Sequence, residues 1–171
     1  MSARAALLVL TLSLLLPSCA GYQLGASKPT PLAQVSVIHV EMVDNQTQVP
    51  RAAAYTTNAL ADALTRDGTY RLGTADSSDA RLATTIHTIE YEQVRSSPLD
   101  SLASVELAMI VELEWRIIDS NNPVRILDHG ESVGRTSFFA APNLATARQT
   151  AITDAVRRAT EELVARIANG F

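Results

Sequence analysis

The sequence contains a single cysteine, Cys19, among 171 residues, and this scarcity excludes two classes of site. One thiol cannot form an intrachain disulfide, and it cannot supply the ligand set of a cysteine-based zinc site. Any role of Cys19 is therefore a solitary one.

Basic residues are also few, with 14 Lys and Arg against 18 Asp and Glu and a formal net charge of -4. A nucleic-acid partner requires clustered cations, so this balance excludes a nucleic-acid-binding function. The chain is nevertheless 47% hydrophobic and 19% charged, which is typical of a folded globular protein. We therefore expect a single folded domain.

One apolar run extends from Ala5 to Leu16, and it is too short to cross a hydrocarbon core, which takes about 20 residues. It follows Arg4 and the amino terminus and precedes Pro17-Ser18-Cys19-Ala20, an arrangement typical of a signal peptide. We expect residues 1–18 to be removed. The mature protein is then expected to have no transmembrane helix and a formal charge one unit more negative than the -4 of the whole chain.

The segment Leu16-Pro17-Ser18-Cys19 resembles the bacterial lipobox, although Pro17 is unusual there. The resemblance implies a covalent lipid on Cys19, such as palmitate, with residues 19–31 as a tether, and several acyl chains on one residue form a stable anchor. Because Ala20 is not an aspartate, the resemblance also implies export to the outer membrane. The alternative is that Ser18-Cys19-Ala20 is an ordinary cleavage site, which leaves a free periplasmic protein.

Hydrophobic spacing predicts the elements of the mature domain. The first part is expected to contain a buried strand, a helix that Asp67-Gly68 ends, and a short strand, at Val35–Val43, Pro50–Arg66 and Tyr70–Thr74. A long strand at Arg81–Val94 changes phase between Thr88 and Ile89, which indicates a bulge.

The strand expected at Ser104–Ile118 alternates almost strictly, so that one face is apolar and includes Leu107, Val111 and Trp115. Its other face carries Glu106, Glu112, Glu114 and Arg116. After a turn, Val124–Phe139 is expected to return antiparallel to it. A long amphipathic helix follows Pro142-Asn143 and ends at Asn169-Gly170.

This order predicts an α+β fold, a two-layer sandwich of a mixed or antiparallel four- to five-stranded sheet with two helices on one face. We expect residues 32–171 to form this one domain. Since one face of the central strand is acidic, both helices are expected on the opposite face.

Gly130-Glu131-Ser132-Val133-Gly134 matches the G-x-S-x-G pattern of a nucleophile elbow. That motif requires a helix after the serine and a histidine later in the chain, yet Arg135–Phe139 is strand-like and every histidine precedes Ser132. We therefore expect Ser132 to be structural, with Ser132→Ala no costlier than a surface substitution. The two glycines are expected to ease twist or bulging of the strand.

No other catalytic or metal-binding pattern is evident. His39, His87 and His129 are isolated in predicted strands, so we expect no metal site and no cofactor. Glu112 and Glu114 share a strand face and could serve acid–base chemistry, but a solvated face explains them as well. Residue logic alone therefore predicts a small, anchored protein that is not an enzyme.

Several features of the sequence, taken in order, resemble the lipopolysaccharide-assembly lipoprotein family LptE. They are the segment Cys19-Ala-Gly-Tyr22-Gln-Leu24-Gly25, the strand to Val43, the helix ended by Asp67-Gly68, the long strands and the closing helix. The resemblance extends over essentially the whole mature chain. It implies an outer-membrane lipoprotein that plugs the lumen of an LptD-type β-barrel and helps it to assemble and to deliver lipopolysaccharide to the outer leaflet.

Family members are also credited with binding lipopolysaccharide directly. That ligand is polyanionic, whereas the mature chain is acidic, so any contact would have to use local cations such as Arg95, Arg125 or Arg135. The resemblance assigns no ligand-binding residue in this sequence.

Two other functions remain open at this point. One is a different outer-membrane lipoprotein, a cofactor that docks on a peptidoglycan synthase or an efflux component. The other is a small serine hydrolase built on Ser132.

Overall fold

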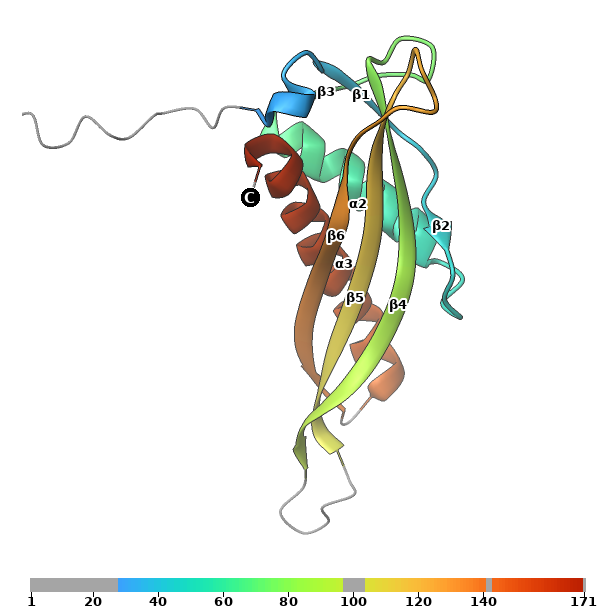
Figure 1. The fold of residues 1–171 in the computed structure, drawn as a ribbon. Helices are drawn as coiled ribbons and strands as arrows, with labels where there is room; N and C mark the ends of the chain where they lie inside the picture. The colour runs from blue at the N-terminus through green and yellow to red at the C-terminus, as the bar shows by residue number, and fades with distance from the viewer. Residues whose placement is uncertain (1–27, 97–103, 141–142, 171) are drawn as a thin grey trace, which may run out of the picture.

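The computed structural model describes residues 28–96, 104–140 and 143–170. Within these ranges the chain forms a mixed six-stranded sheet with two α-helices across one of its faces (Figure 1). The strand order is β3-β1-β4-β5-β6, and β2 pairs with β4 beside this path. The predicted α+β sandwich with both helices on one face is confirmed.

The elements, in chain order, are η1 (Thr30–Leu32), β1 (Val37–Val40), β2 (Asp44–Asn45), α2 (Ala52–Asp67), β3 (Arg71–Leu72), β4 (Ala80–Ser96), β5 (Ser104–Asp119), β6 (Ile126–Phe139) and α3 (Leu144–Asn169). β4, β5 and β6 are antiparallel, whereas β1 and β2 run parallel to β4. The expected count of four to five strands is too low, because the strand predicted at Val35–Val43 ends early and β2 forms a further short pairing.

Both helices end where the sequence signals predict. Gly68 and Gly170 follow α2 and α3 with φ of 76° and 79°, a left-handed conformation that glycine adopts without strain. At its start, α3 is capped by the Asn143 side chain, which accepts a hydrogen bond from the Thr146 N–H at 3.2 Å.

The bulge predicted in β4 is present, but it lies one residue earlier than the sequence indicated. Ile86 pairs with Leu113 and Thr88 pairs with Glu112, so His87 is the extra residue. Thr88 therefore faces away from the helices, and its hydroxyl donates to Glu112 Oε2 at 2.9 Å. Ile89 is consequently back in phase with the buried side chains of the first half of the strand.

The core lies between the sheet and the helices. On β5 the inward side chains are fully or almost fully buried, namely Met109, Val111, Leu113, Trp115 and Ile117. The facing stripe of α3, which includes Leu163 and Ile167, is buried too, and three of its members are small, namely Ala151, Ala155 and Ala159. Small residues on this stripe let α3 lie close to the strands.

Gly134 is the point of closest approach between β6 and α3. A Cβ atom at Gly134 would lie only 1.8 Å from the backbone oxygen of Ala155, and one at Gly130 would lie 2.7 Å from the Trp115 ring. Neither glycine has a positive φ. The pairing of β5 with β6 shows no register shift at either position, so the bulging expected there is absent. These positions lack a side chain because the helix and the tryptophan occupy the space.

The described end of the predicted tether contacts the domain. Lys28 Nζ donates to the Val35 carbonyl at 2.7 Å and lies 4.7 Å from the centre of the Tyr70 ring. The Tyr70 hydroxyl in turn donates to the Ile167 carbonyl at 2.7 Å, in the last turn of α3. Burial, assisted by Asp128 and Asp67, raises the pKa of Tyr70 to about 12. Among the described residues, no helix is long and apolar enough to cross a membrane.

Candidate functional site

Ser132 lies in the middle of β6, on the side that faces α3, and is 1% exposed. Its hydroxyl has no hydrogen-bond partner among the described residues. The strand continues to Phe139, so the turn and helix that a nucleophile elbow requires are absent here. Ser132 therefore lacks the structural context of a nucleophile elbow, and its structural role stays a prediction.

Of the other residues singled out for chemistry, His87, Glu112 and Glu114 line one hollow, whereas His39 and His129 do not line it. His39 Nδ1 lies 3.2 Å from the Gly73 carbonyl, and the described ranges contain no group of three His, Cys, Asp or Glu residues that could hold a metal ion. Trp115 is 3% exposed and belongs to the core, as predicted. Cys19 lies outside the described residues, so its lipidation stays a prediction.

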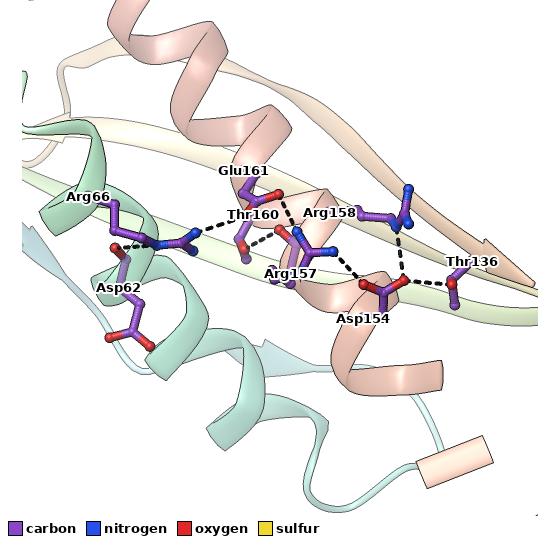
Figure 2. A network of polar contacts seen from close by, with 8 residues as sticks. All are labelled: Asp62, Arg66, Thr136, Asp154, Arg157, Arg158, Thr160 and Glu161. Carbon is purple, nitrogen blue, oxygen red and sulfur yellow. Dashed lines mark hydrogen bonds and ion pairs between the residues drawn. The ribbon is translucent and has the colours of Figure 1, made fainter. Parts of the chain in front are cut away.

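A chain of ion pairs ties α2, α3 and β6 together on the helical side (Figure 2). Arg66 of α2 contacts Glu161 at 3.0 Å, and Glu161 also accepts from Arg157 at 2.7 Å. Asp154 forms ion pairs with both Arg157 and Arg158. Its Oδ2 also accepts a hydrogen bond from the Thr136 hydroxyl of β6 at 2.6 Å.

The surroundings of Asp154 favour its charged form. The hydrogen bond from Thr136, together with those from Arg157 and Arg158, lowers the pKa of Asp154 to about 2 against the opposing effect of partial burial. Every carboxylate of this network is matched by an arginine of the same domain. The network fastens the helices to the sheet, and its three arginines exceed its two carboxylates by one formal positive charge.

The opposite face of β4, β5 and β6, which no helix covers, is arranged differently. We call it the uncovered face (Figure 1). Glu112 and Glu114 are exposed on it, as predicted, and register places Val133 opposite Glu112 and Glu131 opposite Glu114. Between these side chains is a hollow of about 120 Å³, which His87 and Leu113 also line.

Glu112, Glu114 and Glu131 form what we call the glutamate patch. None of the three takes part in an ion pair with another described residue, and neither does Arg116 in the adjacent row. Directly opposed like charges destabilise a sheet. No described ion pair compensates the Glu114–Glu131 pair, and the next outward residue of β5, Arg116, lines a second hollow with both glutamates.

The arginines considered for contact with a polyanion all have acidic partners. Arg95 lies 3.5 Å from Glu106, Arg125 lies 3.5 Å from Asp119, and Arg135 lies 2.8 Å from Glu92. Each of these arginines therefore already has an acidic neighbour within the domain.

A comparison with sequence models of protein families shows which family the chain belongs to. The sequence model of the lipopolysaccharide-assembly family LptE matches residues 35–167, which is most of the protein and nearly all of its folded part. The chain belongs to the LptE family. This is a non-enzymatic family. No curated protein matches the sequence.

Solved structures share the LptE-family fold at low sequence identity. The hypothetical protein CT253 from Chlamydia trachomatis is 12% identical, with a TM-score of 0.57 over 78% of this chain and 95% of that one. Uncharacterized lipoprotein B from Nitrosomonas europaea is 13% identical, with a TM-score of 0.52 over 86% and 88%. A minor lipoprotein from Acinetobacter baumannii is 12% identical, with a TM-score of 0.50 over 78% and 92%.

Sequence reasoning missed two features of this LptE-family domain. The alternation of acidic and basic residues at three- and four-residue spacing from Asp154 to Arg166 was visible and indicates ion pairs along α3. Glu131 could be joined to Glu112 and Glu114 only once the register of β5 and β6 was known. A turn of uncertain length between two strands does not fix that register.

Proposed function

We propose that this LptE-family chain is an outer-membrane lipoprotein that plugs an LptD-type β-barrel and assists its assembly, supporting delivery of lipopolysaccharide to the outer leaflet. The observation that carries the proposal is the family match over residues 35–167. The arrangement of the domain supports it: one sheet face packs against helices, and the other is free to meet a partner.

We further propose that the lipid on Cys19 holds the chain at the outer membrane, periplasm-facing or within the barrel lumen. The lipobox-like segment Leu16-Pro17-Ser18-Cys19 supports this proposal, and two proteins of similar fold bear the name lipoprotein. Cys19→Ala should abolish incorporation of radiolabelled palmitate and release the chain from the membrane fraction. A wild-type chain that takes up no label would contradict the anchor.

Direct binding of lipopolysaccharide through Arg95, Arg125 or Arg135 is not part of the proposal, because all three are paired with acidic residues. Catalysis is not part of it either, since Ser132 is buried on the helix side of β6. The role proposed for the chain is one of binding and positioning.

The test is affinity purification of the tagged full-length chain from detergent-solubilised outer membranes, with mass identification of what it retains. An LptD-type barrel in roughly equal amount is the expected result. Depletion of the chain should also reduce lipopolysaccharide at the cell surface. Recovery of a peptidoglycan synthase or an efflux component in place of the barrel would overturn the proposal.

A further inference from the structure

Two adjoining hollows lie along β6, which is the last strand in the order of the sheet and so has one free edge. One hollow is about 620 Å³, and the other is about 340 Å³ and extends to Pro29 and Pro31. Trp115, His129 and Arg166 line both of them, so the two hollows form one continuous groove. We call it the edge groove.

The course of β6 explains where the edge groove lies. Gly130 is paired with Trp115 of β5, and the indole ring occupies the space that a side chain at Gly130 would take. Further along the strand the edge is closed, because the Val133 N–H donates to Glu162 Oε2 of α3 at 3.0 Å. The groove is therefore confined to the first half of β6.

One buried hydrogen-bond donor beside the edge groove has no acceptor. Trp115 is 3% exposed, and its indole Nε1 has no hydrogen-bond partner among the described residues. A buried N–H without an acceptor is costly, and native structures almost always supply one. An occupant of the groove that carries an acceptor would satisfy this N–H.

The described part of the chain begins beside the same groove. Lys28 is held by the Val35 carbonyl and the Tyr70 ring, and Pro29 after it lines the groove. A chain spans at most about 3.6 Å per residue, so the residues just before Lys28 reach the groove without crossing the rest of the domain. Residues 19–27 lie outside the described residues, and they are the segment attached closest to the groove.

The sequence of this segment suits the edge of a sheet. Its apolar or aromatic residues alternate with glycine and polar residues, in the order Ala20, Gly21, Tyr22, Gln23, Leu24, Gly25, Ala26 and Ser27. Alternation of this kind is typical of an extended segment with one buried side. An edge strand binds such a segment through its backbone groups, and alternate side chains of the segment enter the hollows beside the strand.

Covalent attachment favours this segment over other occupants. A segment tied to the domain beside the groove has a high effective concentration there, whereas a partner protein or a second copy must first associate. The segment also carries backbone carbonyls and the Tyr22 hydroxyl, each of which can accept a hydrogen bond from an indole N–H.

We infer that Tyr22 and Leu24 of the tether lie in the edge groove, where the segment pairs with the edge of β6 and accepts a hydrogen bond from Trp115 Nε1. This inference rests on the proposed function in one respect, because it takes Cys19 as the lipid-bearing start of the mature chain. Only Cys19 to Gly21 then separates the lipid from the domain, a reach of about 10 Å. The end of the domain that bears η1 therefore stays at the membrane surface, and the rest can extend into the barrel.

The first test traps the docked tether by a disulfide in the purified full-length, lipid-bearing chain. Lipidation blocks the thiol of Cys19, so Tyr22→Cys or Leu24→Cys, each combined with Ile126→Cys, supplies two free thiols. In the control, Val124→Cys replaces Ile126→Cys, because Val124 is 90% exposed against 51% for Ile126 but does not line the groove. With at least one tether position, the disulfide should form about fivefold faster or more at residue 126 than at residue 124.

The outcomes of this test separate the inference from the proposed function. Rates at residue 126 that do not exceed those at residue 124, for both tether positions, would overturn the inference. Capture of the barrel does not depend on this result, so the proposed function would stand. The intact mass shows whether Cys19 carries the lipid. A chain without the lipid would contradict the anchor, and Cys19→Ser in that chain would still test the docking.

A second test uses the fact that Trp115 is the only tryptophan of the chain, so its indole N–H gives a single NMR resonance. Tyr22→Ala/Leu24→Ala should shift this resonance and make its exchange with water about tenfold faster or more. The control Gln23→Ala/Ser27→Ala changes the other side of the segment and should leave both unchanged. An indole resonance that Tyr22→Ala/Leu24→Ala does not alter would overturn the inference. So would a wild-type resonance that shifts only when the purified barrel is added, because a partner segment would then fill the groove.

Discussion

The two faces of β5 have opposite relations to the rest of the molecule, although they belong to the same strand. Met109, Val111 and Leu113 point to the helices and are fully buried, whereas Glu112 and Glu114 point the other way and are exposed. Successive side chains of a strand alternate in this way, so neighbours in sequence experience a core and a solvent environment in turn. Stability is therefore concentrated on one face, and the exposed side chains of the other face contribute little to the core.

The same contrast holds for polar groups. On the helical side, the Thr136 hydroxyl donates to the carboxylate of Asp154, which belongs to the arginine network. Gly134 lies so close to α3 that a side chain at this position would overlap with the helix. On the uncovered face, Thr88 donates to an exposed carboxylate, and Val133 lies partly in solvent. Matched substitutions on the two faces should therefore differ in effect, and the four predictions below test that difference in order of expected size.

The largest effect is expected for Val111→Asp. Val111 is fully buried, so this change places an unpaired carboxylate in the core and should cost roughly 4 kcal/mol or more, enough to unfold a domain of ordinary stability. Glu112→Lys, one residue along, should melt near the wild type. A Glu112→Lys protein that melts as low as Val111→Asp would show that both faces are covered, and the contrast between them would be lost.

Gly134→Ala is expected to be the next most costly change. Its methyl group would meet the backbone oxygen of Ala155, so α3 would have to move, at a cost of about 2–3 kcal/mol in urea unfolding. Val133→Thr, adjacent on the uncovered face, should change stability by less than about 0.5 kcal/mol. An equal loss of unfolding free energy in the two variants would show that α3 can move away from residue 134 with little loss of stability.

Thr136→Val should cost about 1 kcal/mol at neutral pH, because it removes a hydrogen bond that lowers the pKa of Asp154. A carboxyl whose pKa falls to about 2 on folding stabilises the folded state fully above its unfolded pKa of about 4. This contribution declines as the pH falls from about 4 towards 2. The wild type should therefore lose its advantage over Thr136→Val across that interval.

Thr88→Val is the control for this pH dependence, since its hydroxyl also donates to a carboxylate, but on the uncovered face. Its effect should be smaller at neutral pH because solvent competes for the exposed carboxylate. Unfolding free energies of both variants at several pH values between 2 and 7 would measure the difference. Identical curves would show that the arginine network adds nothing to the Thr136–Asp154 bond.

The smallest effect is expected for Ser132→Ala. Its hydroxyl is buried without a partner among the described residues, so its removal should change the free energy of unfolding by no more than about 0.5 kcal/mol and in the stabilising direction. Ser137→Ala, on the exposed side of β6, is the matched comparison. A fluorophosphonate probe should label none of the three proteins, which are the wild type, Ser132→Ala and Ser137→Ala. Wild-type labelling that Ser132→Ala abolishes would mean that the serine is a nucleophile after all.

Much of the fold could be predicted because its periodicities are strong and local. The alternation from Leu107 to Ile117 and the three- and four-residue spacing from Ile152 to Ile167 each specify one buried face. Gly68 and Gly170 mark helix ends through a backbone conformation that other residues avoid. These signals require no knowledge of distant residues.

The predictions that were wrong concern features that depend on contacts between elements. The role of Gly134 is set by how close α3 approaches, and the pairing of Arg135 with Glu92 is set by the register of three strands. β2 is a two-residue pairing whose strand character comes from β4 rather than from its own sequence. The glutamate patch likewise joins residues from two strands, so no single stretch of sequence indicated it.

The bulge at His87 determines how the length of β4 can change during evolution. Leu82, Thr84 and Ile86 face the helices before it and Ile89 faces them after it, so removing His87 alone leaves a strictly alternating strand with the same inward residues. Deleting Thr85 instead would move the residues next to the deletion to the opposite face of the strand, so inward side chains would point away from the core. Among relatives of this chain, a one-residue gap in β4 should therefore fall at His87, where an alignment based on sequence similarity alone has little reason to place it.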